Sequence, residues 1–282
     1  MSISYVTSNT VTERLKRLPT DCHKGTNGTL NIVAGCERFR GAADLCVGGA
    51  LRTGCGIIRL ISEEKVISLV ASRHPSCTFA LAESSDEIKS VINGISSKVF
   101  LVGCGIGQTE RSAAAVFSVL ANAEKAVLDA DALNILSANP QMLFQLKGHI
   151  ITPHVMEFSR LTGLSPAEIK SDPQKHALNF SEKYGCVTVL KDSVTVICAP
   201  NGNVYISEHA SEGLSKGGSG DVLAGIIGGI LAQGYTAEDA AVIGVALHAY
   251  ASQLCAKELG KRGMLPSDLE IYVAKLLNSL GY

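Results

Sequence analysis

The stretch Lys216-Gly217-Gly218-Ser219-Gly220-Asp221 stands directly before Val222–Ala232, a run of apolar and small residues without any charge. A helix that is apolar on every side is buried in the protein core. Glycines allow the backbone to approach a ligand closely, and the positive end of the following helix favours a phosphate there. Asp221 falls in the first helical turn, where its carboxylate can take a proton from a hydroxyl beside that phosphate. The alternative is a carboxylate that only stabilises the start of the helix.

Elsewhere in the chain, short β-branched segments alternate with helical patterns. Several of the expected strands are apolar throughout, which is typical of strands covered on both faces. The expected strands are Thr29–Ala34, Ile57–Ile61, Val99–Val102, Ala126–Asp129, His149–Thr152, Val187–Leu190, Val194–Ala199 and Val204–Ser207. The expected helices between them include Ala42–Thr53, Ala113–Ala121, Glu157–Thr162 and Pro173–Tyr184. This alternation predicts a layered α/β sandwich.

The last part of the chain departs from that alternation. A Pro200–Asn203 turn joins the final two strands, which predicts a hairpin and a mixed sheet that is mostly parallel. Beyond the glycine-rich stretch the pattern is helical throughout, and Thr236–Asp239 and Ser267–Glu270 are typical of capping boxes. The sequence shows no linker, low-complexity segment or repeat, so we expect a single domain over residues 1–282.

Composition excludes several classes of protein. A formal net charge of −1 and a pI of about 6.7 provide no basic field for nucleic acid or an anionic membrane. The longest apolar stretch, Val222–Ala232, is too short to span a bilayer, and the first residues do not resemble a signal peptide. The 9 cysteines form no CxxC pair and have no zinc spacing, so we expect reduced thiols in a cytoplasmic protein. Charged residues make up 18%, a low share that suits an oligomer.

Small and acidic residues follow two other expected strands, at the ends where ligands bind in open α/β sheets. Gly103-Cys104-Gly105-Ile106-Gly107 lacks the third glycine of a dinucleotide-binding fingerprint, and a structural turn explains it equally well. In Asp129-Ala130-Asp131, the two carboxylates can bind Mg²⁺, or Asp131 can cap the helix that follows.

Two further segments combine turn residues with polar or small ones. In Thr152-Pro153-His154-Val155-Met156-Glu157, the proline stiffens the turn and His154 can donate a hydrogen bond to a polar substrate. Glu157 can hold Mg²⁺ or cap its helix. Arg40-Gly41-Ala42-Ala43 opens a helix with small residues, which permits either the close approach of a flat ligand or packing against the sheet.

Together these segments resemble the NAD(P)H-hydrate dehydratases in their stand-alone form, from about His23 to the C-terminus. The combination of Thr-Pro-His-x-x-Glu at 152–157 with Lys-Gly-Gly-Ser-Gly-Asp at 216–221 carries the resemblance. A lone Gly-Ser-Gly-Asp fits any ribokinase-like kinase. Further matching segments are His23–Gly28, Gly41–Ala43, Ala50–Gly54, Gly103–Gly107, Asp129–Asn134 and Val189–Lys191.

The resemblance implies a ribokinase-like fold, a three-layer α/β/α sandwich around a central, mostly parallel mixed sheet. It implies the removal of water from hydrated NADH or NADPH of the S epimer, driven by cleavage of ADP or ATP in the presence of Mg²⁺. It also implies a homo-oligomer such as a homotetramer. This chain is too short to hold an epimerase as well, so we expect a separate NAD(P)H-hydrate epimerase in the same pathway.

The resemblance also assigns roles to individual residues. Asp221 resembles the catalytic base and a contact to the hydrate, and Gly218 and Gly220 resemble an anion hole for the phosphoryl group. The other expected substrate contacts are Ala42, Ala43, Gly105 and His154. The expected nucleotide contacts are Lys191, Asp192, Ser193, Val194, Thr195, Gly218, Ser219 and Gly220. Glu157 and Asn134 are expected to organise Mg²⁺ indirectly.

The sequence departs from the family pattern at three positions. Cys104 stands where a proline is usual, which leaves that turn less rigid. Asp192 stands where a glycine is usual, which alters the expected nucleotide contacts. Ser219 replaces a common threonine and keeps the hydroxyl.

Two other functions are compatible with parts of this pattern. One is a small-molecule kinase of the same fold that phosphorylates a hydroxymethylpyrimidine, a thiazole alcohol or a sugar. The other is a nucleotide-binding sensor without turnover. The segment Thr152–Glu157 favours the dehydratase over the kinase, and Asp221 disfavours the sensor, because binding alone requires no base there.

Overall fold

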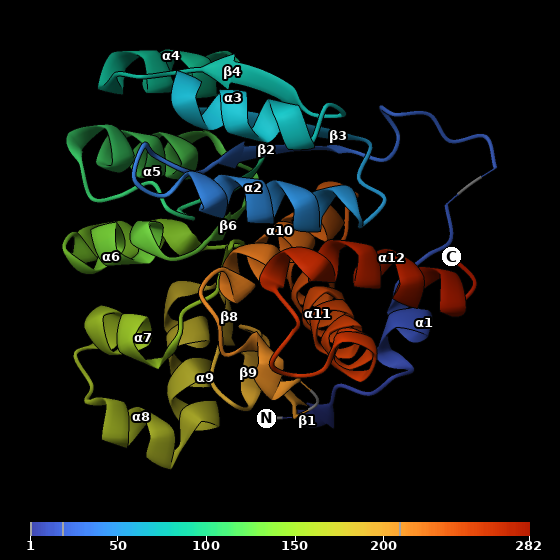
Figure 1. Ribbon diagram of the computed structural model, residues 1–282. Helices are drawn as coiled ribbons and strands as arrows, with labels where there is room; N and C mark the ends of the chain where they lie inside the picture. The colour runs from blue at the N-terminus through green and yellow to red at the C-terminus, as the bar shows by residue number, and fades with distance from the viewer. Residues whose placement is uncertain (1, 19, 209) are drawn as a thin grey trace.

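The computed structural model describes residues 2–18, 20–208 and 210–282. The strands of these residues form one ten-stranded sheet in the order β1-β10-β9-β8-β7-β6-β5-β2-β3-β4 (Figure 1). Neighbouring strands are parallel, except that β9 runs antiparallel to both β8 and β10. The strands are β1 Ser2–Tyr5, β2 Thr29–Val33, β3 Ile57–Ser62, β4 Thr78–Leu81, β5 Val99–Val102, β6 Lys125–Leu128, β7 Ile150–Ile151, β8 Val187–Leu190, β9 Thr195–Cys198 and β10 Asn203–Ser207.

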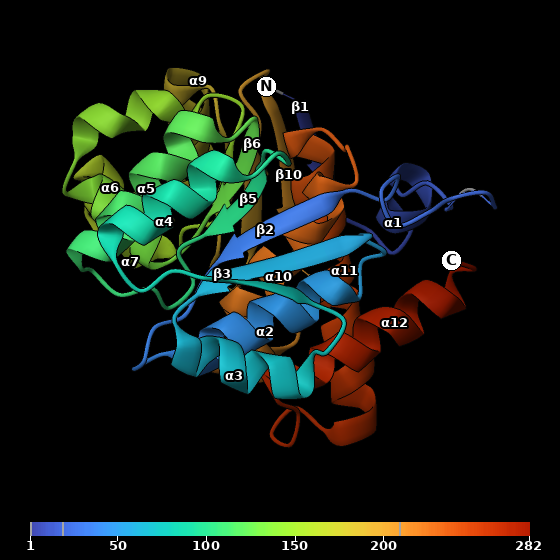
Figure 2. The same ribbon diagram turned by 90° about the horizontal axis from the view of Figure 1, so that it is seen from above.

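Helices cover both faces of the sheet, as Figure 2 shows from above. One face carries α2 Arg40–Leu51, α3 Glu64–Arg73, α10 Ser219–Ala232, α11 Ala237–Leu259 and α12 Leu269–Ser279, with the short α1 Thr10–Arg14 beside α11. The other carries α4 Ser85–Gly94, α5 Glu110–Asn122, α6 Asp131–Ser137, α7 Val155–Thr162, α8 Pro166–Ser171 and α9 Pro173–Tyr184. Three 3₁₀ helices, η1 Pro140–Leu146, η2 Glu212–Leu214 and η3 Pro266–Asp268, complete the elements. The expected three-layer α/β/α sandwich is therefore confirmed.

The glycine-rich helix α10 packs directly on the backbone of α2. A Cβ atom on Gly225 would lie 2.1 Å from the carbonyl oxygen of Cys46, and one on Gly49 would lie 2.6 Å from that of Val222. Because only glycine leaves room for such contacts, the two helices approach more closely than side chains allow. The same helix lies against β5 and β6, which holds its first turn at the carboxyl ends of these central strands.

The strands expected from the sequence are all present, with small shifts at their ends. β7, for example, covers only Ile150–Ile151 of the expected His149–Thr152. The sequence pattern missed β1 and β4, which form the two edges of the sheet. All four residues of β1 are exposed, and β4 is exposed or half-buried throughout. Edge strands of this kind lack the apolar run that identifies a buried strand.

Of the two expected capping boxes, one forms only its N-cap half and the other is absent. Thr236 does cap α11, because its hydroxyl accepts a hydrogen bond from the N–H of Asp239 at 3.0 Å. The box predicted at Ser267–Glu270 is wrong. Asp268 instead accepts a 2.6 Å hydrogen bond from the N–H of Leu265 and closes η3, and α12 starts after it without a side-chain cap. The Glu270 carboxylate is drawn toward α2, where the missing Cβ of Gly48 makes room for it.

The structure also bears on the thiols and on membranes. All 9 cysteines are free, and most of them are buried, as expected of reduced thiols used as small apolar groups. Among the described residues, we find no helix whose length and apolar character would carry it across a bilayer.

The α2–α10 contact predicts a strong dependence of stability on Gly225. Gly225→Ala should lower the free energy of unfolding by about 1–3 kcal/mol, because the new Cβ meets backbone that cannot rotate away. Urea unfolding followed by circular dichroism measures this. The matched control is Gly94→Ala at the end of α4, where a Cβ meets nothing within 4 Å. Equal midpoints for the two variants would contradict the packing argument.

Candidate active site

The glycine-rich loop turns into α10 through a left-handed residue. Gly218, the N-cap, has a φ of 100°, and a Cβ there would lie 2.4 Å from Leu45 Cδ1, so the position requires glycine. The hydroxyl oxygen of Ser219 is buried without a hydrogen-bond partner, although its residue borders a cavity. The first N–H groups of an α-helix also lack intrahelical partners. The start of α10 therefore offers donors to an anionic ligand.

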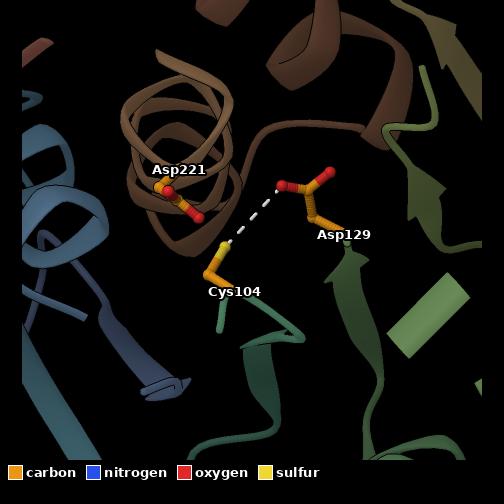
Figure 3. Close-up of side chains that lie close together, drawn as sticks. All are labelled: Cys104, Asp129 and Asp221. Atoms are coloured by element: carbon orange, nitrogen blue, oxygen red, sulfur yellow. Dashed lines mark hydrogen bonds between the residues drawn. The ribbon is translucent and has the colours of Figure 1, made fainter. Parts of the chain in front are cut away.

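Asp221, in the first turn of α10, faces the ends of two central strands. Its carboxylate, the thiol of Cys104 after β5 and the carboxylate of Asp129 after β6 have ligand atoms within 4.8 Å of one another (Figure 3). Burial, and next the charge of Asp129, raise the pKa of Asp221 to about 7. A carboxyl with a pKa near neutrality can accept a proton from a substrate and release it again.

Asp129 is tied to the strand on its other side. Its Oδ1 accepts hydrogen bonds from the Lys191 ammonium at 2.7 Å and from the Thr152 hydroxyl at 2.7 Å, and only 2% of the residue is exposed. Burial would lower the pKa of Lys191, but the carboxylates of Asp129 and Glu157 outweigh it and raise that pKa. The ammonium is thus held as a cation inside the site.

The expected nucleotide-binding stretch 191–195 links β8 to β9 and borders a cavity of about 480 Å³. Lys191, Asp192, Ser193 and Thr195 line this cavity together with Ser219 and Gly220 of the glycine-rich loop. Val194 lines a second cavity of about 310 Å³ on the α8 side of the same stretch. The structure therefore brings two segments far apart in the sequence to one cavity.

Asp192, the departure from the family glycine, is held away from the glycine-rich loop. Its carboxylate pairs with Lys170 Nζ of α8 at 2.9 Å and accepts the N–H of Ser193 at 2.9 Å. It borders both cavities, so the extra side chain anchors the stretch to α8 at their common wall.

His154 and Glu157 cap α7 reciprocally. His154 Nδ1 accepts the N–H groups of Met156 and Glu157, and Glu157 Oε2 accepts the N–H of His154. With Nδ1 as acceptor, the neutral imidazole carries its proton on Nε2, which lies 3.2 Å from Glu157 Oε1, and the residue borders the larger cavity. Burial, and to a smaller extent the charge of Lys191, lower the pKa of His154. The structure therefore places the His154 imidazole at the cavity wall, with both of its nitrogens close to atoms of its own helix.

The residues expected near Mg²⁺ already have protein partners. Glu157 Oε2 is taken by the cap and its Oε1 lies 3.2 Å from His154 Nε2, while Asn134 Oδ1 accepts Arg160 Nη1 at 2.8 Å. Asp131 Oδ2 accepts the N–H of Gly107 at 2.8 Å, so the Asp129 and Asp131 pair is also engaged. This arrangement fits an outer role toward Mg²⁺ carried by nucleotide phosphates, with water between.

The small residues expected to contact the substrate lie together beside the strand ends. A Cβ on Gly105 would lie 2.7 Å from Ala42 Cβ, so these two residues are in direct contact. Ala42 is half-buried, whereas Ala43 is fully buried and packs near Gly35. Ala42 and Gly105 are therefore accessible to a ligand. Ala43 is not accessible, but its small side chain lets the backbone there pack closely.

Sequence reasoning missed part of this site. Asp129 was expected only as a magnesium ligand, and Thr152 was expected only as part of a motif. Their position at strand ends was the signal, but their partner Lys191 comes from a distant strand. His248 was also missed as a neighbour of the loop: it is buried, and its Nε2 lies 3.1 Å from the Ser219 carbonyl oxygen. Burial lowers the pKa of His248 to about 4, so it is neutral.

Cys104 carries no reactive thiol. It is fully buried, and its Sγ donates to Asp129 Oδ2 at 3.7 Å. Contact with the Cys46 thiol, then burial, raise the pKa of Cys104 well above its ordinary value. A protonated thiol thus fills the place where a proline is usual.

The fold and the site define an α/β protein with a glycine-rich helix N-terminus that offers donors to an anion, beside a buried acid and a half-buried lysine. A family model described as NAD(P)H-hydrate dehydratase matches residues 30–275, and the chain belongs to that family. The expected family membership is therefore confirmed.

Individual relatives agree with this assignment. The chain is 32% identical over 256 residues to the ADP-dependent (S)-NAD(P)H-hydrate dehydratase of Neisseria meningitidis serogroup B, covering 88% of this chain and 84% of that protein. The chain spans about half the length of the bifunctional NAD(P)H-hydrate repair enzymes Nnr that it matches, 52% in Coxiella burnetii (32% identical) and 50% in Escherichia coli (35% identical).

Solved structures confirm the ribokinase-like fold. The ADP/ATP-dependent NAD(P)H-hydrate dehydratase of Bacillus subtilis, co-crystallised with ATP and Mg²⁺, superimposes with a TM-score of 0.87 at 28% identity, covering 99% of both chains. A ribokinase-like superfamily protein of Enterococcus faecalis has a TM-score of 0.87 at 24% identity, covering 98% of this chain and 96% of its own.

The raised pKa of Asp221 predicts a pH-dependent stability. Because the folded protein holds this proton more tightly than the unfolded chain does, the resulting stabilisation is complete below pH 3.8 and is lost as the pH rises through about 7. The amide of Asp221→Asn does not titrate, so the variant does not lose this stabilisation as the pH rises. The variant should gain free energy of unfolding relative to the parent between about pH 5 and about pH 8.5, by at most about 3 kcal/mol. Urea titrations at both pH values measure the difference, and a pH-independent difference would contradict the raised pKa.

Proposed function

We propose that this protein dehydrates hydrated NADH and NADPH of the S epimer, using ADP or ATP as phosphoryl donor. The observation that carries the proposal is the Asp221 carboxyl, whose pKa of about 7 suits proton transfer, at the glycine-rich start of α10. Family membership supports the substrate class, because the relatives are named for this hydrate and for ADP or ATP.

Asp221 acts as the base in this proposal. Its carboxylate takes the proton of the hydrate hydroxyl, whose oxygen then attacks the terminal phosphorus of the nucleotide. The shortened nucleotide leaves. The phosphorylated carbon next loses its phosphate, and the neighbouring ring carbon loses a proton, so that the ring double bond of the nicotinamide is restored.

The surrounding residues stabilise the charge on the transferred group. The loop of Gly218, Ser219 and Gly220 directs donors to the phosphoryl oxygens, and the unpartnered Ser219 hydroxyl is available for one of them. The ammonium of Lys191, which lies beside Gly220, adds a positive charge. In a site this enclosed, such interactions are stronger than in water.

The two ligands occupy different sides of this arrangement. The nucleotide lies against residues 191–195 and the glycine-rich loop, in the cavity of about 480 Å³. The hydrated ring lies against Ala42, Gly105 and the imidazole of His154. Ala43 shapes that wall from beneath.

The proposal extends to cofactor, assembly and location. Mg²⁺ neutralises the nucleotide phosphates when bound, with Glu157 and Asn134 contributing through water. The protein works in the cytoplasm as a homo-oligomer, such as a homotetramer, alongside an NAD(P)H-hydrate epimerase. The names of the bifunctional repair enzymes support the coupling to a second repair activity.

The direct test follows reduced nicotinamide absorbance with enzymatically prepared NADH hydrate, Mg²⁺ and either ADP or ATP. The parent should restore the absorbance, and Asp221→Ala should slow turnover by about 10² to 10⁴ while the nucleotide still binds. Asp221→Asn is the isosteric control for shape.

Other outcomes identify the competing functions. Phosphorylation of an alcohol, without recovery of reduced nicotinamide, would indicate a small-molecule kinase. Nucleotide binding with neither reaction would indicate a sensor. Unchanged turnover in Asp221→Ala would remove the base from the mechanism.

His154 provides a second prediction. Since its ring both caps α7 and borders the cavity, His154→Asn keeps a capping oxygen, but its shorter side chain does not reach the position of Nε2. The variant should raise KM for the hydrate by about tenfold and leave KM for the nucleotide near that of the parent. Steady-state kinetics with each ligand varied in turn measures both. An unaltered KM for the hydrate would place His154 outside the substrate site.

A further inference from the structure

The buried carboxylate of Asp129 connects residues that end four neighbouring strands. It follows β6, its Oδ1 accepts Thr152 after β7 and Lys191 after β8, and its Oδ2 accepts Cys104 after β5. Among the described residues, the one non-glycine with a positive φ is Ala130, at 49°, directly after Asp129. Unfavourable backbone of this kind persists where the surrounding structure requires it and is frequent at functional sites.

The partner that Asp129 holds lies at the predicted phosphoryl position. A Cβ on Gly220 would lie 3.2 Å from Lys191 Nζ and 4.0 Å from Asp129 Oδ2. The ammonium therefore rests against the loop that receives the transferred group. Without a carboxylate behind it, a lysine with three free rotatable donors would not be confined to this position.

Asp129 also lies beside the carboxyl that acts as base. The charged and titratable groups that act on Asp221 are Asp129 after β6, Cys104 after β5, Lys191 after β8 and Asp131 at the start of α6. The charge of Asp129 favours the protonated form of Asp221, and the charge of Lys191 opposes it. Of the two aspartates, Asp129 has the larger effect.

We propose that Asp129 is a positioning residue of the reaction: it anchors the Lys191 ammonium beside Gly220 and sets a second negative charge next to Asp221. One buried acid thereby controls both the cation that meets the phosphoryl group and the proton affinity of the base. The proposal rests on the proposed function. It assigns Asp129 no role as a metal ligand, since protein donors already occupy both of its oxygens.

Asp129→Asn is the main test, because it keeps the size and the acceptor oxygen but removes the charge. The acidic limb of the pH profile of kcat should move down by about one pH unit or more, because Asp221 loses its negative neighbour. The plateau of kcat should fall by about 10-fold to 100-fold, because Lys191 loses its charged anchor. Circular dichroism and thermal unfolding establish that the variant is folded.

Thr152→Val is the matched control. It removes the neutral hydroxyl at 2.7 Å from Asp129 and leaves the charge of Asp129 in place. Its acidic limb should stay within about 0.3 pH unit of that of the parent. An acidic limb that stays with the parent in folded Asp129→Asn, or that moves equally in both variants, would overturn the proposal.

A measurement on the unmodified chain covers the case in which Asp129→Asn does not fold. With ¹³C-labelled aspartate, the Asp221 carboxyl signal should titrate near pH 7, and Asp221→Asn identifies it by its disappearance. The Asp129 carboxyl signal, assigned through bonds, should change at the same pH. An Asp129 signal that ignores this titration overturns the proposal.

Failure of this proposal is distinguishable from failure of the proposed function. The parent can convert hydrated NADH to NADH while Asp221→Ala does not. If folded Asp129→Asn then keeps the acidic limb of the parental pH profile, only the role of Asp129 is wrong. If the parent does not convert hydrated NADH to NADH, the proposed function is wrong, and so is the role of Asp129 in that reaction.

Discussion

Backbone contact between α2 and α10 is the constraint on which the site depends. Gly49 and Gly225 let the helices touch without intervening side chains, so the position of α10 is set by two rigid backbones rather than by flexible groups. The contact of α10 with β5 and β6 then fixes its first turn over their carboxyl ends. The position of Asp221 follows from this packing.

A balance of buried charges is built on that frame. Asp129 would be costly to bury alone, and the ammonium of Lys191 offsets that cost within a hydrogen-bonded pair. Within the described residues Asp221 forms no ion pair, and burial and the charge of Asp129 outweigh the charge of Lys191 and raise its pKa to about 7. The same pairing that stabilises one acid leaves the other able to exchange a proton near neutral pH. Chemistry and stability are therefore opposed at Asp221, as is common where an active site needs a group in an unfavourable environment.

Most of the sheet was predictable because its inner strands are largely buried on both faces, so that their sequences are mostly apolar. β1 and β4 were not predicted, because one is fully exposed and the other is half-exposed. Such strands lack the continuous apolar run that identifies a buried strand. The cap expected at Ser267–Glu270 failed because local spacing ignores tertiary partners: Gly48 on α2 opens space for Glu270, and Asp268 caps another turn. The glycine-rich loop, the Thr-Pro-His turn and Asp221 were recognisable from the sequence because each lies in one short segment.

The sequence by itself determined the layered α/β fold, the buried glycine-rich helix and the identity of the acid at its start, because these depend on local periodicity and on residue types that stand next to one another. Only the tertiary structure decided what surrounds that acid. Asp129, Lys191 and Cys104 come from three strand ends, and their mutual distances follow from the order of strands in the sheet. Electrostatic effects depend on distance and burial, which neighbouring positions in a chain do not report. For that reason the sequence was enough to identify the residue types of the site, whereas the pKa of its base required the tertiary structure.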